Sequence, residues 1–550
     1  MLFDALFANG QFRTQDPARP LAGAIGVHAG RIISLDDELG PESFRTVHDL
    51  GGATAVPGFN DAHYHLSHVG QADLQLDLRP AVAPSLDALL AAVSRAAAAA
   101  DPHAWVIGSG YDQNRLGAHP TAEQLDSVSH GRPVYLIHSS RHMGVANTRA
   151  FELAGFPGRR GIVAPDGGAA PAAPDGRAVG LLQETARALV MEAIPGPSAA
   201  DVADYVAAGS RAALAVGLTS VTEPGLGAPE GIGMSRWDLA GYQLARDQGR
   251  LGVRATVMPY LTTLHRIDGA ETEGHPHYGL DLGTRTGLGD DLLRVGPVKV
   301  LSDGSLIGRS AYMLSEYEAD ALEGSHNHGM LQFAEEELRE RLIGAHLAGW
   351  QLAVHAIGDA ALDVAMDIIE AAHAAAPRAD ARHRIEHLSV ASDAQIARVA
   401  RLGIVPVPQG RFVSELGDGV LRALGPERAR LAYRVRSLLD AGIELPASTD
   451  APVVDGSPLL NIHDLVNRRT AAGAEFGPDE RITVAQAVRA STVGSAYASH
   501  DETRKGTLAR GMLADFAVLS QDLYTIPAQE IAETEVRATV VAGRIAYGDL

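Results

Sequence analysis

The sequence predicts an α/β protein: a (β/α)8 barrel of the TIM-barrel type, with a small β-sandwich built from both ends of the chain. Short apolar segments alternate with long alanine-rich segments through the middle of the chain, which is typical of parallel strands joined by helices. Eight apolar segments are candidate strands, and eight is the number that closes such a barrel. The gap between the first two candidate strands is far longer than the others, so the barrel is expected to carry a long insertion after strand one.

The candidate strands bring polar residues to one edge of the predicted barrel. They end near His63, Thr222, Tyr260, Asp303, Ala356, His387, Pro408 and Asp450. In a (β/α)8 barrel the carboxyl ends of all strands meet at one face, and the catalytic groups lie there. The histidines and carboxylates at these ends are therefore candidates for one shared site.

The predicted β-sandwich has two parts, residues 1–56 and residues 496–550, which flank the barrel at 57–495. Both parts contain short strand-like segments, and both contain a Gly-Arg hairpin turn, at Gly30-Arg31 and at Gly543-Arg544. Two β-rich ends around a different middle indicate one small domain assembled from both.

The insertion is predicted at residues 68–205, because one crossover helix cannot account for that length of chain. It has strand candidates of its own at 105–110 and 134–138. Residues 156–177 are rich in proline and glycine and are expected to form a surface loop or lid within it.

Composition limits the classes of function. The chain has 46 Lys and Arg against 67 Asp and Glu, a formal net charge of −21, so nucleic acid and membrane partners are not expected. It has no cysteine, which leaves His, Asp, Glu and Lys as metal ligands and bases. The chain has neither a basic signal-peptide start nor an apolar run that could span a bilayer, so a cytoplasmic protein is expected. The expected partner is a small-molecule substrate, and the chain could form a homodimer, the commonest symmetric assembly.

The segment 56–65 carries two histidines separated by one residue. In an extended strand His63 and His65 point to the same face, so both imidazoles can bind one divalent metal. Asp61 lies two residues earlier on the same face. In a chain with 22 histidines this spacing also arises by chance. A metal site is therefore indicated only if later strands supply further ligands.

Later strands end in residues of matching chemistry. Lys299 lies in an otherwise apolar strand, where burial lowers the pKa of a lysine. It either pairs with a carboxylate or takes up CO2 as a neutral amine, forming a carbamate that bridges two metals. His355 and His387 end two successive strands, as hydrogen-bonded core residues or as metal ligands. Asp450 ends the eighth strand, as a helix N-cap or as the general base that activates a metal-bound water.

Five motifs, in this order, make the sequence resemble the amidohydrolase superfamily: PGFNDAHYH, VKVLSDGS, HAIGDAALD, RIEH and STDAPV. Two further stretches, at 108–115 and 180–184, are similar to the amidohydrolase-3 or YtcJ-like branch, which holds the N-substituted formamide deformylases. The tail at 505–515 resembles the return of the chain to the β-sandwich in that superfamily. The resemblance covers nearly the whole chain.

The resemblance implies a metal-dependent hydrolase that cleaves a C–N bond of an amide or formamide. A carboxylated Lys299 would bridge a first metal, held by the paired histidines, and a second. Asp450 would contact the first metal and serve as the general base toward a metal-activated hydroxide. Zinc is the expected ion, one or two per chain, because the ligands are imidazole and carboxylate without thiolate. The residues that would hold the metals are His63, His65, Lys299, His355, His387 and Asp450.

Other functions use similar residues. A ring deaminase of this superfamily usually lacks the lysine and carries a glutamate on the helix after strand five, whereas Lys299 is present here and Asp359 follows His355. A lactone or carbamate hydrolase would use the same site and stays open. A non-catalytic scaffold is disfavoured, since all six ligand positions hold suitable residues.

Substrate contacts are expected from two regions. Arg309, just past the fourth strand, could bind a substrate carboxylate or the oxyanion, or it could form a surface or structural salt bridge. Gln409, after the seventh strand, and His328 could likewise have either a substrate-binding or a structural role. Residues of the insertion either cover the pocket or only pack the insertion on the barrel; the candidates are Tyr111, Asp112, Gln113 and His142.

Overall fold

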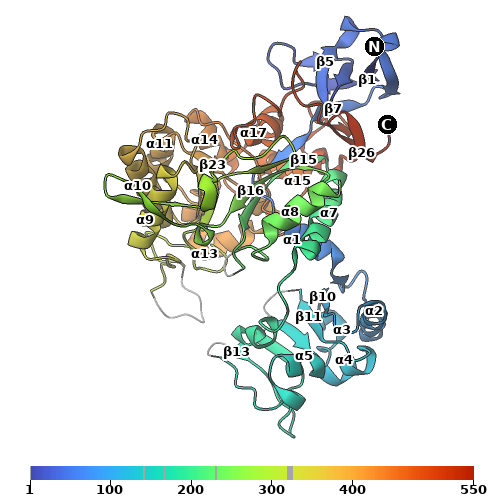
Figure 1. Ribbon diagram of the computed structural model, residues 1–550, viewed down its shortest axis with the longest axis vertical. Coiled ribbons are helices and arrows are strands. Elements are labelled where there is room, and N and C mark those ends of the chain that lie inside the picture. The colour runs from blue at the N-terminus through green and yellow to red at the C-terminus, as the bar shows by residue number, and fades with distance from the viewer. Residues whose placement is uncertain (1, 140–142, 166–167, 230–231, 319–325) are drawn as a thin grey trace. The chain divides into compact units, whose positions relative to one another are not determined.

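The computed structural model describes residues 2–139, 143–165, 168–229, 232–318 and 326–550 (Figure 1). The chain divides into two compact units, one made of Met1–Val69 with Ser198–Leu550 and the other of Gly70–Pro197. The first unit joins parallel strands to helices, so the predicted α/β class is confirmed. Within the described ranges no helix combines the length and the apolar character that crossing a membrane requires.

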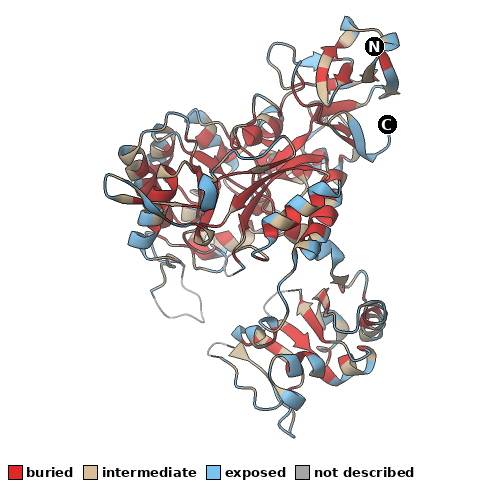
Figure 2. Cartoon of the chain, viewed as in Figure 1, coloured by how far each residue is buried: buried red, intermediate tan, exposed pale blue. Residues whose placement is uncertain are grey.

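Two four-stranded parallel sheets form the centre of the first unit. Their strands are almost wholly buried, as in β21, because both faces of each sheet are covered (Figure 2). The first sheet, in spatial order, contains β19 (Leu293–Val295), β16 (Arg254–Pro259), β15 (Leu218–Leu226) and β8 (Phe59–Asp61). The second contains β20 (Val298–Leu301), β21 (Leu352–Ala356), β22 (Arg384–His387) and β23 (Val405–Val407).

Backbone contacts connect these sheets into a ring. A parallel bridge between Tyr260 and Lys299 joins β16 to β20, which directly follows β19 in the chain. Another parallel bridge, between Gln409 and Ser448, places the segment 445–450 beside the end of β23. That segment also contacts the residues after β8, the first strand of the arrangement, because Asp450 N donates to His63 O at 2.8 Å. We call this arrangement, from β8 through β23 to residues 445–450, the strand ring.

The helices that follow the strands bury one face and expose the other (Figure 2). In α10 (Asp359–Ala375), the buried positions recur every three or four residues, which is the spacing of one apolar helix face. Ser392 caps α11 (Asp393–Arg401) by accepting a hydrogen bond from Gln395 N. The other helices of this kind are α7 (Ala199–Ala215), α8 (Asp238–Asp247) and α9 (Glu335–Leu347).

Both ends of the chain contribute to two further sheets around one apolar core. β7 (Thr54–Pro57) pairs with β24 (Phe516–Leu519), so the two ends share a sheet. Phe7 and Phe516 meet edge to face in the core, with ring centroids 4.9 Å apart. The first sheet contains β5 (Arg31–Leu35), β4 (Ile25–His28), β1 (Phe3–Ala8) and β6 (Phe44–Asp49). The second contains β26 (Arg544–Gly548), β25 (Val536–Val541), β24, β7, β2 (Gln11–Arg13) and β3 (Leu21–Ala22).

β7 passes directly into β8, so the shared sheet leads into the strand ring. Gly58 lies between the two strands, and a Cβ atom there would approach the Thr219 side chain to 2.2 Å. Only glycine lets the backbone pass this closely. This close contact fixes the path of the backbone into the ring five residues before His63.

The second unit has a six-stranded sheet of its own. Two of its strands, β10 (Val106–Tyr111) and β11 (Val134–His138), lie where the sequence predicts strands. The sheet order is β13 (Gly168–Ala169), β14 (Leu181–Glu184), β12 (Met143–Ala146), β11, β10 and β9 (Leu76–Asp77). Its main helices are α2 (Leu86–Ala99), α4 (Ala122–Val128) and α5 (Thr148–Leu153).

A buried histidine pair lies at the amino end of β22. Leu352 N donates to His383 Nδ1 at 3.0 Å, so the hydrogen of this imidazole lies on Nε2 and is donated to His346 Nδ1 at 2.8 Å. The Nε2 of His346 then donates to Ala376 O at 2.8 Å. Burial lowers the pKa of His383 well below its ordinary value, so the pair is neutral.

Acid is expected to destabilise the fold through His383. The unfolded chain binds this proton at a pKa near 6.5 and the folded chain only at much lower pH, so the contribution to stability is complete above about pH 6.5. Below that it is lost, by up to about 1.4 kcal/mol per pH unit. Thermal unfolding midpoints should therefore fall less steeply in His383→Asn between about pH 8 and about pH 5. Equal slopes in the two proteins would contradict this assignment.

Candidate metal centre

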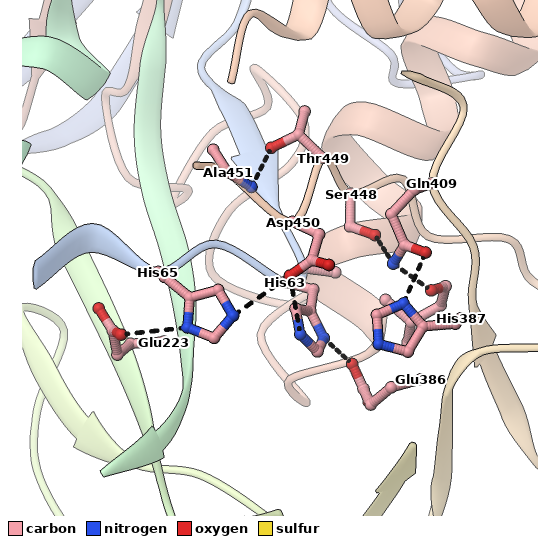
Figure 3. Close-up of polar contacts among 12 residues, drawn as sticks. His63, His65, Glu223, Glu386, His387, Gln409, Ser448, Thr449, Asp450 and Ala451 are labelled. Carbon is pink, nitrogen blue, oxygen red and sulfur yellow. Dashed lines mark hydrogen bonds and ion pairs between the residues drawn. The ribbon is translucent and has the colours of Figure 1, made fainter. Parts of the chain in front are cut away.

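The six residues predicted to bind metal all line one cavity at the carboxyl ends of the ring strands. Figure 3 shows four of them: His63, His65, His387 and Asp450. The cavity has a volume of about 350 Å³, which is in the range of small-molecule sites. The residues come from the segment after β8, from β20, β21 and β22, and from the end of 445–450: His63, His65, Lys299, His355, His387 and Asp450.

Asp450 lies between the paired histidines. Its Oδ1 is 3.4 Å from His63 Nε2 and 3.2 Å from His65 Nε2. Two donors bound tetrahedrally at about 2.1 Å from one ion lie roughly 3.4 Å apart, so this spacing suits a shared metal. Donor atoms of His63, His387 and Asp450 also lie within 4.8 Å of one another.

A buried carboxylate holds the other ring nitrogen of His63. His63 Nδ1 pairs with the Glu386 carboxylate, and Arg384 donates to both oxygens of that carboxylate at 2.8 and 3.0 Å. Arg384 also donates to Ala62 O at 2.6 Å. Glu386 and Arg384 are fully buried. This pairing orients the His63 ring and leaves Nε2 directed toward Asp450.

His65, like His63, directs its Nδ1 toward a buried glutamate side chain. Its Nδ1 lies 3.8 Å from Oε1 of Glu223, which lies within the buried strand β15. Glu223 accepts hydrogen bonds from Ser67 N at 2.9 Å and from the Tyr242 hydroxyl. Burial raises the pKa of Glu223 to about 7.

His355 is anchored with the opposite nitrogen. Its Nε2 bonds Gly304 O at 3.1 Å and lies 3.3 Å from Asp303 Oδ1. Asp303 is held by the backbone N–H groups of Ile357 and Gly358. The buried Nδ1 of His355 has no hydrogen-bond partner, so it is the nitrogen that remains for a metal.

Burial keeps two of these imidazoles in the neutral form that binds metal. It lowers the pKa of His63 and of His387 well below the ordinary value for histidine. A neutral imidazole offers one lone pair, which a metal requires. At each of the four histidines, one nitrogen faces an oxygen atom of the protein and the other remains for a ligand.

Lys299 is fully buried, and its Nζ has no hydrogen-bond partner. Burial lowers its pKa to about 8, against the opposing attraction of Glu386 and Asp450. Leaving such a group unsatisfied is costly, which indicates that something else occupies the space around it. Four imidazoles, one carboxylate and this amine together fit a divalent metal.

The wall of the cavity is largely apolar. It is built by the loop after β20 and by two helices after β23, α12 (Arg411–Glu415) and α13 (Gly417–Ala429). The Phe412 ring lies parallel to that of His387. Sequence reasoning did not identify this wall, whose residues are Leu306, Ile307, Ile357, Phe412, Leu416, Val420 and Val453.

The other predicted contacts have varied environments. Arg309 is not among the residues that line the cavity, and its Nη1 donates to Glu318 O at 2.8 Å. Asp61 accepts hydrogen bonds from Thr449 N and Oγ1, so it joins β8 to 445–450. His328 bonds Met313 O through Nδ1 at 3.1 Å.

The predicted contacts from the insertion belong to the second unit. Tyr111 is buried there and its hydroxyl lies 3.1 Å from His119 Nδ1. Asp112 caps a short helix, and Gln113 pairs with His138. His142 lies outside the described residues. A role for these four in substrate binding stays a prediction.

Replacing Lys299 by methionine is expected to stabilise the metal-free protein. Methionine fills a similar volume without a polar atom, so the cost of an unsatisfied buried group, about 1–3 kcal/mol, disappears. The thermal unfolding midpoint, measured after chelation, should rise, and bound metal should fall in the same variant. A lower midpoint without metal would show that the amine has a stabilising partner.

Comparison with known proteins identifies the family. The amidohydrolase family model Amidohydro_3 matches residues 46–547. The chain is 30% identical to the protein LONG AFTER FAR-RED 3 of Arabidopsis thaliana, over 99% of this chain and 91% of the plant protein. It is 29% identical to the putative amidohydrolase YtcJ of Bacillus subtilis, over 90% of each. It is also 29% identical to the N-substituted formamide deformylase of Arthrobacter pascens, over 99% of this chain and 98% of that enzyme.

A solved structure agrees with the fold. An uncharacterized metal-dependent hydrolase of Pyrococcus furiosus superimposes with a TM-score of 0.73 and 25% sequence identity. The match covers 95% of this chain and all of the other. The sequence motifs, the family model and these relatives agree, and the chain belongs to the amidohydrolase family, in its YtcJ-like branch.

Proposed function

We propose that this protein is a metal-dependent hydrolase that cleaves the C–N bond of an amide or formamide. The observation that carries the proposal is the convergence of all six predicted ligands on one cavity, with one ring nitrogen of His63, His355 and His387 hydrogen-bonded to the protein. The likeness to an N-substituted formamide deformylase over nearly the whole of both chains supports the choice of bond.

We further propose that the strand ring is a closed (β/α)8 barrel. In this proposal the two ends of the chain form the β-sandwich, and the second unit is the insertion in the barrel.

The proposed metal is zinc, held by His63, His65, His355, His387 and Asp450. Imidazole and carboxylate donors suit this ion. When bound, a divalent metal lowers the pKa of water and polarises a carbonyl group. The protein's own contribution is to fix the ligand geometry and to surround the reacting bond with apolar side chains.

Asp450 is the proposed general base. Its carboxylate is nearly buried, faces the cavity and lies beside both histidines of the pair. It accepts the proton that the attacking water loses and returns it to the nitrogen that departs. The water oxygen then ends on the carbonyl carbon as the C–N bond breaks.

Lys299 is proposed to carry a carbamate. A pKa of about 8 makes an appreciable fraction of its amine neutral near neutral pH. The neutral nitrogen adds to the carbon of CO2, forms an N–C bond and loses one proton. The resulting anion would replace an unsatisfied amine by two oxygens that could serve as metal ligands.

Metal content tests the proposal directly. The protein, purified with bicarbonate present, should contain two equivalents of metal per chain by elemental mass spectrometry. One equivalent would favour a single-metal site without the carbamate and reopen the deaminase alternative. Failure to bind zinc even after reconstitution would overturn the proposal.

Asp450→Asn should abolish most turnover and leave much of the metal bound. The amide cannot accept the proton, so kcat/KM for an N-substituted formamide should fall by roughly 10²–10⁴. Asp455→Asn is the matched control, because Asp455 lies five residues further along the same loop and is exposed. Full activity in Asp450→Asn would rule out this general base.

A further inference from the structure

Gln409 is a fully buried amide directly behind one of the proposed metal ligands (Figure 3). It follows β23 and its two amide atoms point in different directions. The oxygen Oε1 lies 2.8 Å from His387 Nδ1. The nitrogen Nε2 lies 2.9 Å from Val407 O and 2.9 Å from Ser448 Oγ.

The orientation of this amide is determined by the groups around it. Val407 O can only accept a hydrogen bond, so the atom facing it must be the NH2 group of Gln409. Ser448 gives its hydroxyl hydrogen to Pro408 O at 3.0 Å, so Ser448 Oγ accepts from the same NH2 group. A flipped amide would oppose its carbonyl oxygen to Val407 O, and it could keep a bond with Ser448 only if that hydroxyl gave up its bond to Pro408 O.

The oxygen of Gln409 therefore faces His387, and it can only accept. His387 must carry its hydrogen on Nδ1, and the lone pair of the neutral ring then lies on Nε2. His387 offers a donor atom within 4.8 Å of those of His63 and Asp450. Donation therefore runs outward from the candidate metal centre, from His387 to Gln409, from Gln409 to Ser448 and from Ser448 to the backbone.

The same amide joins two parts of the site. It connects His387, at the end of β22, to the segment 445–450 that carries Asp450. At His63 a carboxylate performs the equivalent task, whereas here the acceptor is uncharged and is aligned by a backbone carbonyl group and the Ser448 hydroxyl. A neutral acceptor fixes the ring without adding negative charge to the site.

We propose that Gln409 is a positioning residue that fixes the tautomer and ring orientation of His387 so that Nε2 can bind metal. This inference rests on the proposed metal-dependent function. Gln409 itself does not contact the substrate or the metal. Ser448 supports it by accepting from its NH2 group.

Three variants separate positioning from general stability. Gln409→Leu removes the acceptor behind His387, and Gln409→Glu keeps an oxygen there. Gln351→Leu is the matched control, because Gln351 at the amino end of β21 is also buried and its NH2 group likewise donates two hydrogen bonds, in this case both to backbone carbonyl groups. Zinc affinity is measured by competition with a chromogenic chelator. The metal-free proteins are also labelled with 15N-histidine, and two-bond 1H–15N spectra report the tautomer of His387, assigned by its loss in His387→Asn.

Gln409→Leu should weaken zinc binding about 10–100-fold, which is typical for loss of a group that orients a ligand. Its His387 signal should change from the Nδ1–H form to a mixture of tautomers. Gln409→Glu should restore most of the affinity, and Gln351→Leu should bind zinc as the starting protein does.

Three results would each overturn the inference. They are an unchanged zinc affinity in Gln409→Leu, an equal loss of affinity in Gln351→Leu, and a starting protein in which the hydrogen of His387 lies on Nε2. A starting protein that binds no zinc would instead refute the proposed function, and the spectra of the metal-free protein would still test the tautomer.

Discussion

The candidate site depends on the hydrogen bonds that join β8 to the segment 445–450. Asp450 N donates to His63 O, and Thr449 donates to the carboxylate of Asp61 through its backbone and its hydroxyl group. These contacts connect parts of the chain that are nearly 390 residues apart in sequence. Without them the paired histidines and the carboxylate between them would belong to unconnected loops. Asp61, which burial gives a pKa of about 7, acts here on the backbone geometry and not as a ligand.

The site lowers the folding stability of the metal-free protein. It collects buried polar atoms, including the amine of Lys299 and the Nδ1 of His355, that have no hydrogen-bond partner. It also holds the Glu386 and Arg384 ion pair in the interior, where the loss of hydration offsets much of the attraction. The surrounding strands and helices compensate with large apolar burial. Residues that weaken the fold in this way are expected where function, and not stability, determines the choice of side chain.

Sequence reasoning could predict the α/β class and the six residues that meet at the cavity. His63, His355, His387 and Asp450 each follow a short apolar segment, so their common position depends only on strands being parallel. The role of Glu386 was missed, although a charged residue between Arg384 and His387 in so short a strand is a signal in itself. Gln409 was identified as a candidate but without a role, because its partners depend on the register between β23 and residues 445–450. The apolar wall from α12 and α13 was not predictable, since apolar helix positions look the same whether they face the core or a cavity.

The sharing of one sheet by both ends of the chain sets an order of assembly during synthesis. β7 ends at residue 57, but its neighbour β24 begins only at residue 516. At ribosomal rates of about 5–20 residues per second, the partner emerges on the order of half a minute or more later. Until then an apolar strand edge waits unpaired, immediately ahead of the paired histidines. All six candidate ligands are synthesised before β24, and a nascent chain interrupted before residue 450 holds five of them but lacks Asp450, which lies between the paired histidines.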